Sequence, residues 1–215
     1  MMSVSNAMPL QQTAVRDFDR ARKQAAMHQF FARVRRQPHE LLSYDDVHDQ
    51  LGARGAIQRG VQEIPLDSII GSVGRYQDFT REFLPKRDSD EERWVGVKTA
   101  VDQMKGMPPI EVYQINDAYF VKDGNHRVSI ARQLGVSSIT AYVTEVETRV
   151  PLSVDDDPDV VIRKARFRRF LEATNFDKLR PDSDLTMTFV GHYQTLLDQI
   201  DVHHRKLQQV GDVAY

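Results

Sequence analysis

Cysteine is absent from this 215-residue chain. Its absence excludes disulfide bonds, thiol nucleophiles and zinc sites ligated by cysteine, and it fits a reducing compartment. Long apolar runs are absent too, since none approaches the roughly 20 residues that a membrane-spanning helix needs. The polar stretch from Met1 to Gln12 lacks the apolar middle part of a signal peptide. The sequence therefore predicts a cytoplasmic protein with no membrane partner.

An excess of charge of one sign is also missing. Lys and Arg together number 29 and Asp and Glu number 31, which gives a net charge of −2 at pH 7. A chain with this balance has no global attraction to nucleic acid or to acidic membranes, so any such affinity depends on a local patch. The length allows one sizeable core with extensions on either side.

Glycine and proline residues that end helices, together with changes in composition, divide the chain into three predicted regions. Apolar residues recur at helical spacing over 13–36, and Ser43 is placed to cap a short helix that stops at Gly52. The next segment, Gly52–Gly60, contains three glycines and two arginines, a composition typical of a linker. The regions are a helical extension with this linker over 1–60, a mixed domain over 61–150 and a mostly helical extension over 151–215.

The middle region alternates predicted strands and helices. Ser89 and Glu92 form a capping box before a helix that ends near Gly106, and Asn116-Asp117 is a turn between two strand-like runs, typical of a hairpin. These features predict an α+β fold with a small mixed sheet. Over Ile64–Ile70 we expect a short strand followed by a helical turn, and further strands at Ile110–Ile115, Tyr119–Lys122 and Ser138 to Val143 or Val146. Residues 71–88 are expected as loop with some helix at Phe79–Phe83, and Val128–Gly135 as helix.

The last region is predicted to be mostly helical. The run Asp155–Asp157 with Pro158 opens a helix rich in arginine and lysine, Leu185–Val190 alternates like an edge strand, and His192–Val202 has helical spacing. Two interpretations stay open for the basic faces of residues 16–36 and 163–169: a nucleic-acid footprint, or ordinary solvated helix surfaces.

The chemistry of the chain is concentrated in Asp123-Gly124-Asn125-His126-Arg127. Glycine lets the backbone approach a ligand closely, and the helix that follows offers unpaired N–H groups and the positive end of its dipole. The side chains of Asn125, His126 and Arg127 can join those N–H groups around an anion, typically phosphate. Arg127 is the strongest single candidate, because a guanidinium grips two phosphate oxygens. We therefore predict a phosphate site at Gly124–Arg127.

Other polar residues keep alternative roles. His126 can hydrogen-bond phosphate, act as an acid or base near neutral pH, or serve a structural role. Asp123 can bind magnesium through its carboxylate or cap the helix. The histidines His192, His203 and His204 invite a metal hypothesis, but no carboxylate completes the set, so we predict surface residues.

The order of these features resembles the ParB/sulfiredoxin fold, shared by ParB partition proteins, sulfiredoxins and free-serine kinases. The resemblance covers about Val61–Val146, and its core runs from Tyr119 to Gly135. It implies that the loop and helix start bind a nucleotide (ATP, ADP or CTP, with Mg²⁺) and that Arg75, in Ser72-Val-Gly-Arg75, faces this nucleotide.

Departures from these families narrow the implied function. Sulfiredoxins carry a cysteine where Asn125 stands, so sulfinic-acid repair by that route is excluded. ParB proteins carry Gly-Glu-Arg-Arg at this site and a later Asn-x-x-Arg-type motif, where this chain has Thr144–Arg149. Free-serine kinases carry Asp-Gly-His-His-Arg, which differs from Asp123–Arg127 at one position.

The sequence thus favours a ParB-like regulatory protein that binds a nucleoside di- or triphosphate, with DNA and a second copy as further candidate partners. One alternative is a small-molecule kinase or NTPase with His126 and Asp123 as catalytic residues. Another is a DNA-binding or interaction protein whose nucleotide site is vestigial. Nuclease activity is not expected, because no cluster of acidic residues suits two metal ions.

Overall fold

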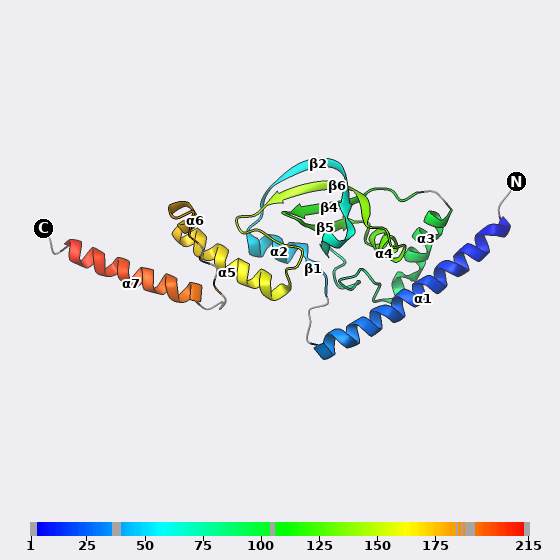
Figure 1. The fold of residues 1–215 in the computed structure, drawn as a ribbon, viewed down its shortest axis with the longest axis horizontal. Helices are drawn as coiled ribbons and strands as arrows, with labels where there is room; N and C mark the ends of the chain where they lie inside the picture. Colours follow the sequence, from blue (N-terminus) through cyan, green and yellow to red (C-terminus); the bar gives the residue numbers. More distant parts are fainter. Residues whose placement is uncertain are drawn as a thin grey trace.

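A six-stranded mixed sheet forms the centre of the protein in the computed structural model, which describes residues 4–35, 40–103, 106–183, 185, 187 and 192–212 (Figure 1). Three neighbouring pairs are parallel (β1 with β3, β3 with β5, β4 with β6) and two are antiparallel (β4 with β5, β2 with β6). In the order β1-β3-β5-β4-β6-β2, the strands are Leu42–Ser43, Ile69–Ser72, Ala118–Asp123, Ile110–Ile115, Ser138–Glu147 and Arg54–Pro65.

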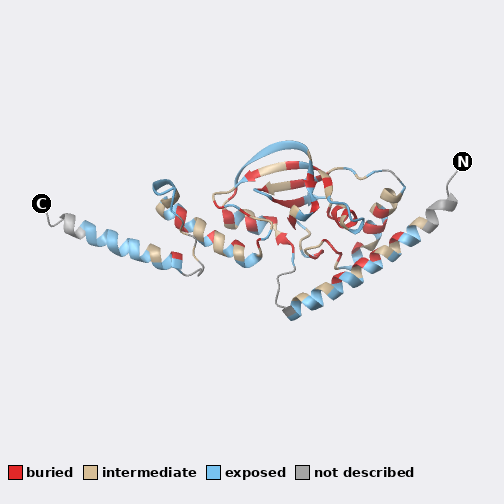
Figure 2. Ribbon diagram, in the orientation of Figure 1, coloured by how far each residue is buried: buried red, intermediate tan, exposed pale blue. Residues whose placement is uncertain are grey.

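Helices pack on both faces of this sheet, so the predicted α+β class is confirmed. On one face α4 buries Val128 and Ala131 against β4, β5 and β6. On the other face α2 and α5 pack around Phe120 of β5, and Figure 2 shows the central strands as largely buried. The helices are α1 (Val4–Arg35), α2 (Tyr44–Leu51), α3 (Glu91–Asp102), α4 (Asn125–Gln133), α5 (Pro158–Thr174), α6 (Phe176–Leu179) and α7 (His192–Asp212), with 3₁₀ turns η1 (Leu66–Ser68) and η2 (Asp88–Asp90).

The predicted linker at Gly52–Gly60 is wrong, because β2 begins at Arg54 and pairs with β6 along its length. Gly55 and Gly60 have positive φ and lie at irregularities of the β2–β6 register, where glycine accommodates a bulge. Glycines that look like a linker in the sequence therefore shape a strand. The predicted boundary at residue 60 falls inside β2.

The amino-terminal helix is longer than the predicted 13–36, since α1 already begins at Val4. It packs on α3 through Ala14 and Phe18, whose ring lies 5.7 Å from that of Trp94. Trp94 in turn donates its indole N–H to Ser129 of α4 at 3.0 Å. These contacts attach α1 to the side of the sheet domain that carries α4.

Two predictions for residues 71–92 are wrong. No helix forms at Phe79–Phe83, because both phenylalanines are buried in the core from an irregular loop in which Phe83 has a φ of 58°. The N-cap position of α3 is Asp90, the last residue of η2, so Ser89 and Glu92 do not form the expected capping box. The side chain of Asp90 is buried and accepts a hydrogen bond from Arg75 instead of capping the helix.

The segment Ile64–Ile70, expected as a strand and a helical turn, contains the end of β2, the 3₁₀ turn η1 and the start of β3. Most other predicted boundaries agree with the structure within four residues. Ser43 caps α2 through Asp46 N–H and Gly52 ends that helix in the left-handed conformation. The hairpin of β4 and β5 turns at Asn116, which has a φ of 55°. Helix α4 starts at Asn125, three residues before the predicted Val128.

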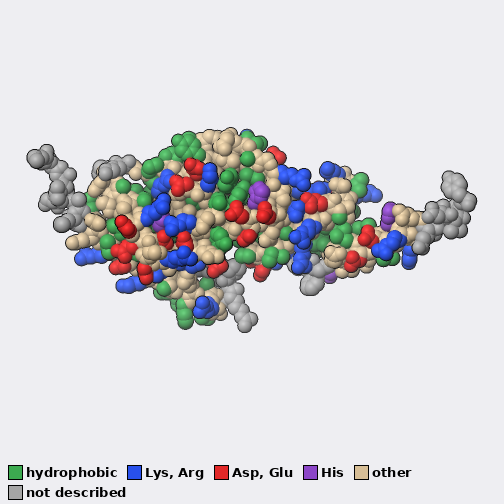
Figure 3. Space-filling view, turned by 180° about the vertical axis from the view of Figure 1, so that it is seen from behind, with side chains coloured by type: hydrophobic (Ala, Val, Ile, Leu, Met, Phe, Trp, Pro, Cys, Tyr) green, Lys and Arg blue, Asp and Glu red, His purple; other side chains and the backbone are tan. Residues whose placement is uncertain are grey.

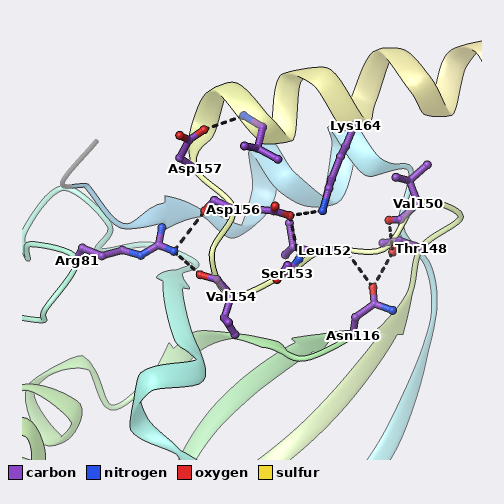
Figure 4. Close-up of polar contacts among 11 residues, drawn as sticks. Arg81, Asn116, Thr148, Val150, Leu152, Ser153, Val154, Asp156, Asp157 and Lys164 are labelled. Atoms are coloured by element: carbon purple, nitrogen blue, oxygen red, sulfur yellow. Dashed lines mark hydrogen bonds and ion pairs between the residues drawn. The ribbon is translucent and has the colours of Figure 1, made fainter. Parts of the chain in front are cut away.

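The connection from β6 to α5 is fixed by a polar network (Figure 4). The side-chain carbonyl of Asn116 accepts from Leu152 N–H at 3.1 Å, and Arg81 donates to the carbonyls of Val154 and Asp156. Asp157 caps α5 by accepting from Val160 N–H at 2.8 Å, and α5 begins at Pro158, where the sequence predicts a helix start. These bonds hold the start of α5 against the sheet domain.

The carboxy-terminal helix α7 runs to Asp212, ten residues beyond the predicted end at Val202. The predicted edge strand Leu185–Val190 lies mostly outside the described residues. Within the described part of the chain, no helix is both long and apolar enough to span a bilayer.

Candidate phosphate-binding site

The predicted phosphate segment lies where β5 leads into α4. Gly124 forms this junction with a φ of 110°, and a Cβ atom on it would lie 2.5 Å from Cγ2 of Ile110. Asp123 is the last residue of β5 and Gly124 is the N-cap residue, so the interpretation of Asp123 as the helix cap is wrong. Because Gly124 has no side chain, the first-turn N–H groups of α4 lack a side-chain cap, and they carry the positive end of the helix dipole.

A pocket of about 360 Å³ opens in front of this helix start. It joins the loop after β3, the outer side of α3 and the whole predicted segment, so the structure brings Arg75 together with Asp123–Arg127. The lining residues are Gly74, Arg75, Arg93, Val97, Lys122, Asp123, Gly124, Asn125, His126 and Arg127.

Arg75 connects three side chains beside the pocket. Its guanidinium donates to Asp78 at 3.0 Å and to Asp90 at 3.0 Å, and it lies 2.8 Å from Nε2 of His126. Burial raises the pKa of Asp90 above its usual range, although the charge of Arg75 opposes that rise. Arg75 therefore holds the loop after β3 against both α3 and α4.

His126 is buried, and its protonation state follows from its neighbours. A guanidinium can only donate hydrogen bonds, so Nε2 accepts from Arg75 and the ring proton lies on Nδ1. Burial and then the charges of Arg75 and Arg93 lower the pKa of His126 to about 4. His126 is thus neutral near pH 7 and its basic nitrogen is already engaged. This geometry favours the predicted hydrogen-bonding role over the predicted acid–base role.

Arg127 is the residue that the sequence ranks first for phosphate, and the structure gives it a second task. Its Nη1 donates to the carbonyl of Pro108 at 3.0 Å and to that of Pro109, and its Nη2 pairs with Asp123. Arg127 thereby fastens the start of β4 to the start of α4. It lines the pocket with its guanidinium engaged by these partners.

Several polar groups of the pocket have no partner among the described residues. The Oδ1 atom of Asn125 and the Nδ1 atom of His126 are buried and make no hydrogen bond, and the two residues are only 6% and 5% exposed. Arg93 lines the same pocket, and no described side chain forms an ion pair with it. An unpaired buried polar group is costly unless a ligand or water satisfies it.

Arg93 and Lys122 add cationic side chains to this pocket, although neither was predicted from the sequence as a site residue. The sequence contains a signal for Lys122, because it is the last residue of the predicted strand Tyr119–Lys122 and directly precedes Asp123. Arg93 and Val97 are four residues apart on α3 and so share a helix face, a spacing that the sequence contains. Which face of α3 turns to the pocket depends on the packing of Trp94, and the sequence alone does not fix it.

The described residues contain no group of three or more His, Asp or Glu side chains arranged for a metal ion. The predicted surface position of His192, His203 and His204 is confirmed, since all three are exposed on α7. Asp123 is a half-exposed carboxylate at the pocket rim. Magnesium is commonly held by one or two carboxylates together with ligand phosphates, and Asp123 fits that pattern.

The predicted basic faces are interrupted by acidic side chains. Lys164 pairs with Asp156, and Arg168 donates to the carbonyl of Gln50 and to Glu172. Figure 3 shows Lys and Arg side chains beside Asp and Glu side chains over much of one face. Arg166 and Arg169 remain exposed on α5.

A comparison with solved structures matches sulfiredoxin from Arabidopsis thaliana, with 20% sequence identity and a TM-score of 0.31 over 40% of this chain and 86% of that chain. No family model and no curated protein matches the chain. The function proposed below therefore rests on the geometry of the pocket.

Proposed function

We propose that this protein binds a nucleoside di- or triphosphate, with the phosphate groups at the amino-terminal end of α4. The observation that carries the proposal is the start of α4, whose first-turn N–H groups have no side-chain cap and lie at the pocket beside Arg93, a cation that no described side chain pairs. Asn125 and His126 line the same pocket, and each keeps one buried polar atom without a partner. Donors and positive charge at a helix start are what a phosphate requires.

Each of these groups has a defined part in the proposal. The N–H groups of the first turn hold one phosphate, and Arg93 neutralises its charge. The amide of Asn125 can rotate so that its NH₂ group donates where Oδ1 now lies, because the two orientations occupy nearly the same space. Arg75 acts as a positioning residue, since its guanidinium is committed to Asp78, Asp90 and His126.

Asp123 is the residue that would bind a magnesium ion. Its carboxylate would share the ion with phosphate oxygens and water, and the ion would offset the charge of the ligand. Its present partner is Arg127, so binding of the ion loosens an exposed pair and leaves the two carbonyl bonds of Arg127 in place.

Calorimetric titration of the full chain with ATP, ADP, CTP and GTP, with and without magnesium, tests the proposal. We expect binding of at least one of them, weakened about tenfold or more by Arg93→Ala, as for loss of a charged hydrogen bond. Arg169→Ala removes an equally exposed arginine from α5 and is the matched control, expected to change nothing. Absence of binding to all four nucleotides at millimolar concentration would refute the proposal.

Measurement of phosphate release in the same samples distinguishes nucleotide binding from nucleotide turnover. His126 is neutral and its Nε2 is engaged, so we expect bound nucleotide to persist for hours without release of phosphate. Magnesium-dependent phosphate release that is lost in Arg93→Ala would instead favour the kinase or NTPase alternative.

A further inference from the structure

The walls of the pocket at the start of α4 consist mainly of charged, polar and small residues. Of its ten described lining residues, seven carry a charged or polar side chain, two are glycines and one, Val97, is apolar. None of these ten residues is aromatic. Sites for drug-sized organic ligands are instead lined mostly by apolar and aromatic side chains, with a few polar groups. The pocket therefore suits the phosphate part of a nucleotide better than its base.

The cationic side chains of the pocket differ in the partners that they already have. Arg75 and Arg127 are each held by carboxylates and other acceptors of the protein, and Lys122 pairs with Glu111 at 2.9 Å. Arg93 forms no ion pair with a described side chain. Bases are held by stacking on an aromatic ring or on a guanidinium plane. Among the described lining residues, Arg93 is thus the guanidinium available to a ligand, for either a phosphate or a base.

Side-chain acceptors are scarce in the same pocket. The amino groups of adenine, cytosine and guanine are donors and need an acceptor to be recognised. Oδ1 of Asn125 is buried, and Nε2 of His126 already accepts from Arg75. The carboxylate of Asp123 is paired with Arg127. The edge of a base would therefore meet positive charge and hydrogen-bond donors, which are the groups that a phosphate needs.

The rim of the pocket at the end of β5 is charged and open to solvent. The side chains of Lys122 and Asp123 are 51% and 58% exposed. The pocket volume of about 360 Å³ is near the lower end of the range of about 300–1,000 Å³ for ligand sites. A ligand whose phosphates lie at the start of α4 therefore has its remaining part at this solvated rim.

We propose that the pocket recognises a diphosphate or triphosphate group and leaves the attached nucleoside in solvent. This inference rests on the proposed function, because it concerns the ligand of the same site. The first-turn N–H groups of α4 and Arg93 bind the phosphate chain. The base makes no contact that distinguishes one nucleotide from another, so the ligand class is defined by the phosphate chain alone.

Methyl triphosphate is the probe for this inference, because it keeps the esterified triphosphate of ATP and lacks the base and the sugar. Calorimetric titration of the full chain at a fixed magnesium concentration compares it with ATP, CTP and GTP. We expect the four dissociation constants to agree within about fivefold, because one stacked base alone changes affinity by about fivefold or more. Adenosine, which has no phosphate, should not bind at millimolar concentration.

The Arg93→Ala variant distinguishes a phosphate contact from a base contact. We expect it to weaken ATP and methyl triphosphate by the same factor, about tenfold or more, because both ligands share the phosphates that Arg93 contacts. Weakening of ATP alone would mean that Arg93 stacks on the base, and it would overturn the inference. Arg169→Ala, on α5, is the matched control and should change neither affinity. Circular dichroism checks that both variants are folded.

The results also separate this inference from the proposed function. Binding of one nucleotide more than about fivefold tighter than methyl triphosphate, or binding of adenosine, overturns the inference and leaves nucleotide binding in place. Binding of methyl triphosphate without binding of any nucleotide overturns both, because the nucleoside is then excluded from the site. Absence of binding by all four triphosphates at millimolar concentration also refutes both.

Discussion

Replacing Gly124 with alanine tests whether the start of α4 depends on a residue without a side chain. The φ of 110° lies outside the regions that alanine favours, which costs about 1–2 kcal/mol. The new methyl group would also lie 2.5 Å from Ile110, a buried core residue. Such overpacking typically costs about 1–3 kcal/mol. Alanine restricts the unfolded chain, which offsets about 0.4–1 kcal/mol of this loss, so we expect a net loss of about 1–5 kcal/mol.

Alanine substitutions at two further glycines separate the cost of the backbone conformation from the cost of the steric overlap. Gly135 has a φ of 70°, but a Cβ atom on it would meet nothing within 4 Å, so Gly135→Ala should lose only about 1 kcal/mol. Gly96 lies within α3 with open space around it, so Gly96→Ala should gain about 0.5–1 kcal/mol. Urea unfolding followed by circular dichroism measures all three variants. An unchanged midpoint for Gly124→Ala, or a loss for Gly96→Ala, would contradict the reasoning.

Three other predictions concern the hydrogen bonds and charges described above. Asn116→Gly keeps the left-handed turn but removes the acceptor of Leu152 N–H, so thermal unfolding should show a loss of about 1–3 kcal/mol, whereas Asn116→Asp keeps the acceptor and should lose less. Trp94→Phe leaves the hydroxyl of Ser129 without its indole donor and should lose about 1 kcal/mol or more in urea unfolding. The lowered pKa of His126 means that the unfolded chain takes up this proton first, so stability should be full above about pH 6.5 and fall as the pH drops towards 4. A His126 pKa near 6.5 by NMR titration would refute the last prediction.

Local signals in the sequence identify much of this fold. Ser43 and Gly52 bracket α2, Asn116 marks the hairpin turn, and Asp157 caps α5. Each of these residues acts on backbone groups within a few positions of itself, so its effect is visible in a short window of sequence. The turn into α4 within the predicted phosphate segment is a local feature too, because Gly124 and the helix start are adjacent in the chain.

The wrong predictions share a different cause. Gly55 and Gly60 look like linker residues because their role as bulges depends on β6, whose residues follow far along the chain. The spacing of Phe79 and Phe83 is that of a helix, yet both rings are held from a loop by a core that they share with five strands. The carboxylate of Asp90 accepts a hydrogen bond from Arg75, fifteen residues earlier, and does not cap α3. Long-range partners decide these positions, and a local pattern does not contain them.

The pairing of β2 with β6 also bears on how the chain folds. Pro65 lies opposite Ser138 and Arg54 lies opposite Glu147, so β2 leaves the ribosome well before its partner strand has been made. Pairings between segments so distant form slowly, because the intervening chain must be ordered first. During that interval β2 has two open edges and no partner. We therefore expect nascent chains to be most prone to aggregation between the synthesis of β2 and that of β6, and to become resistant once Glu147 has emerged.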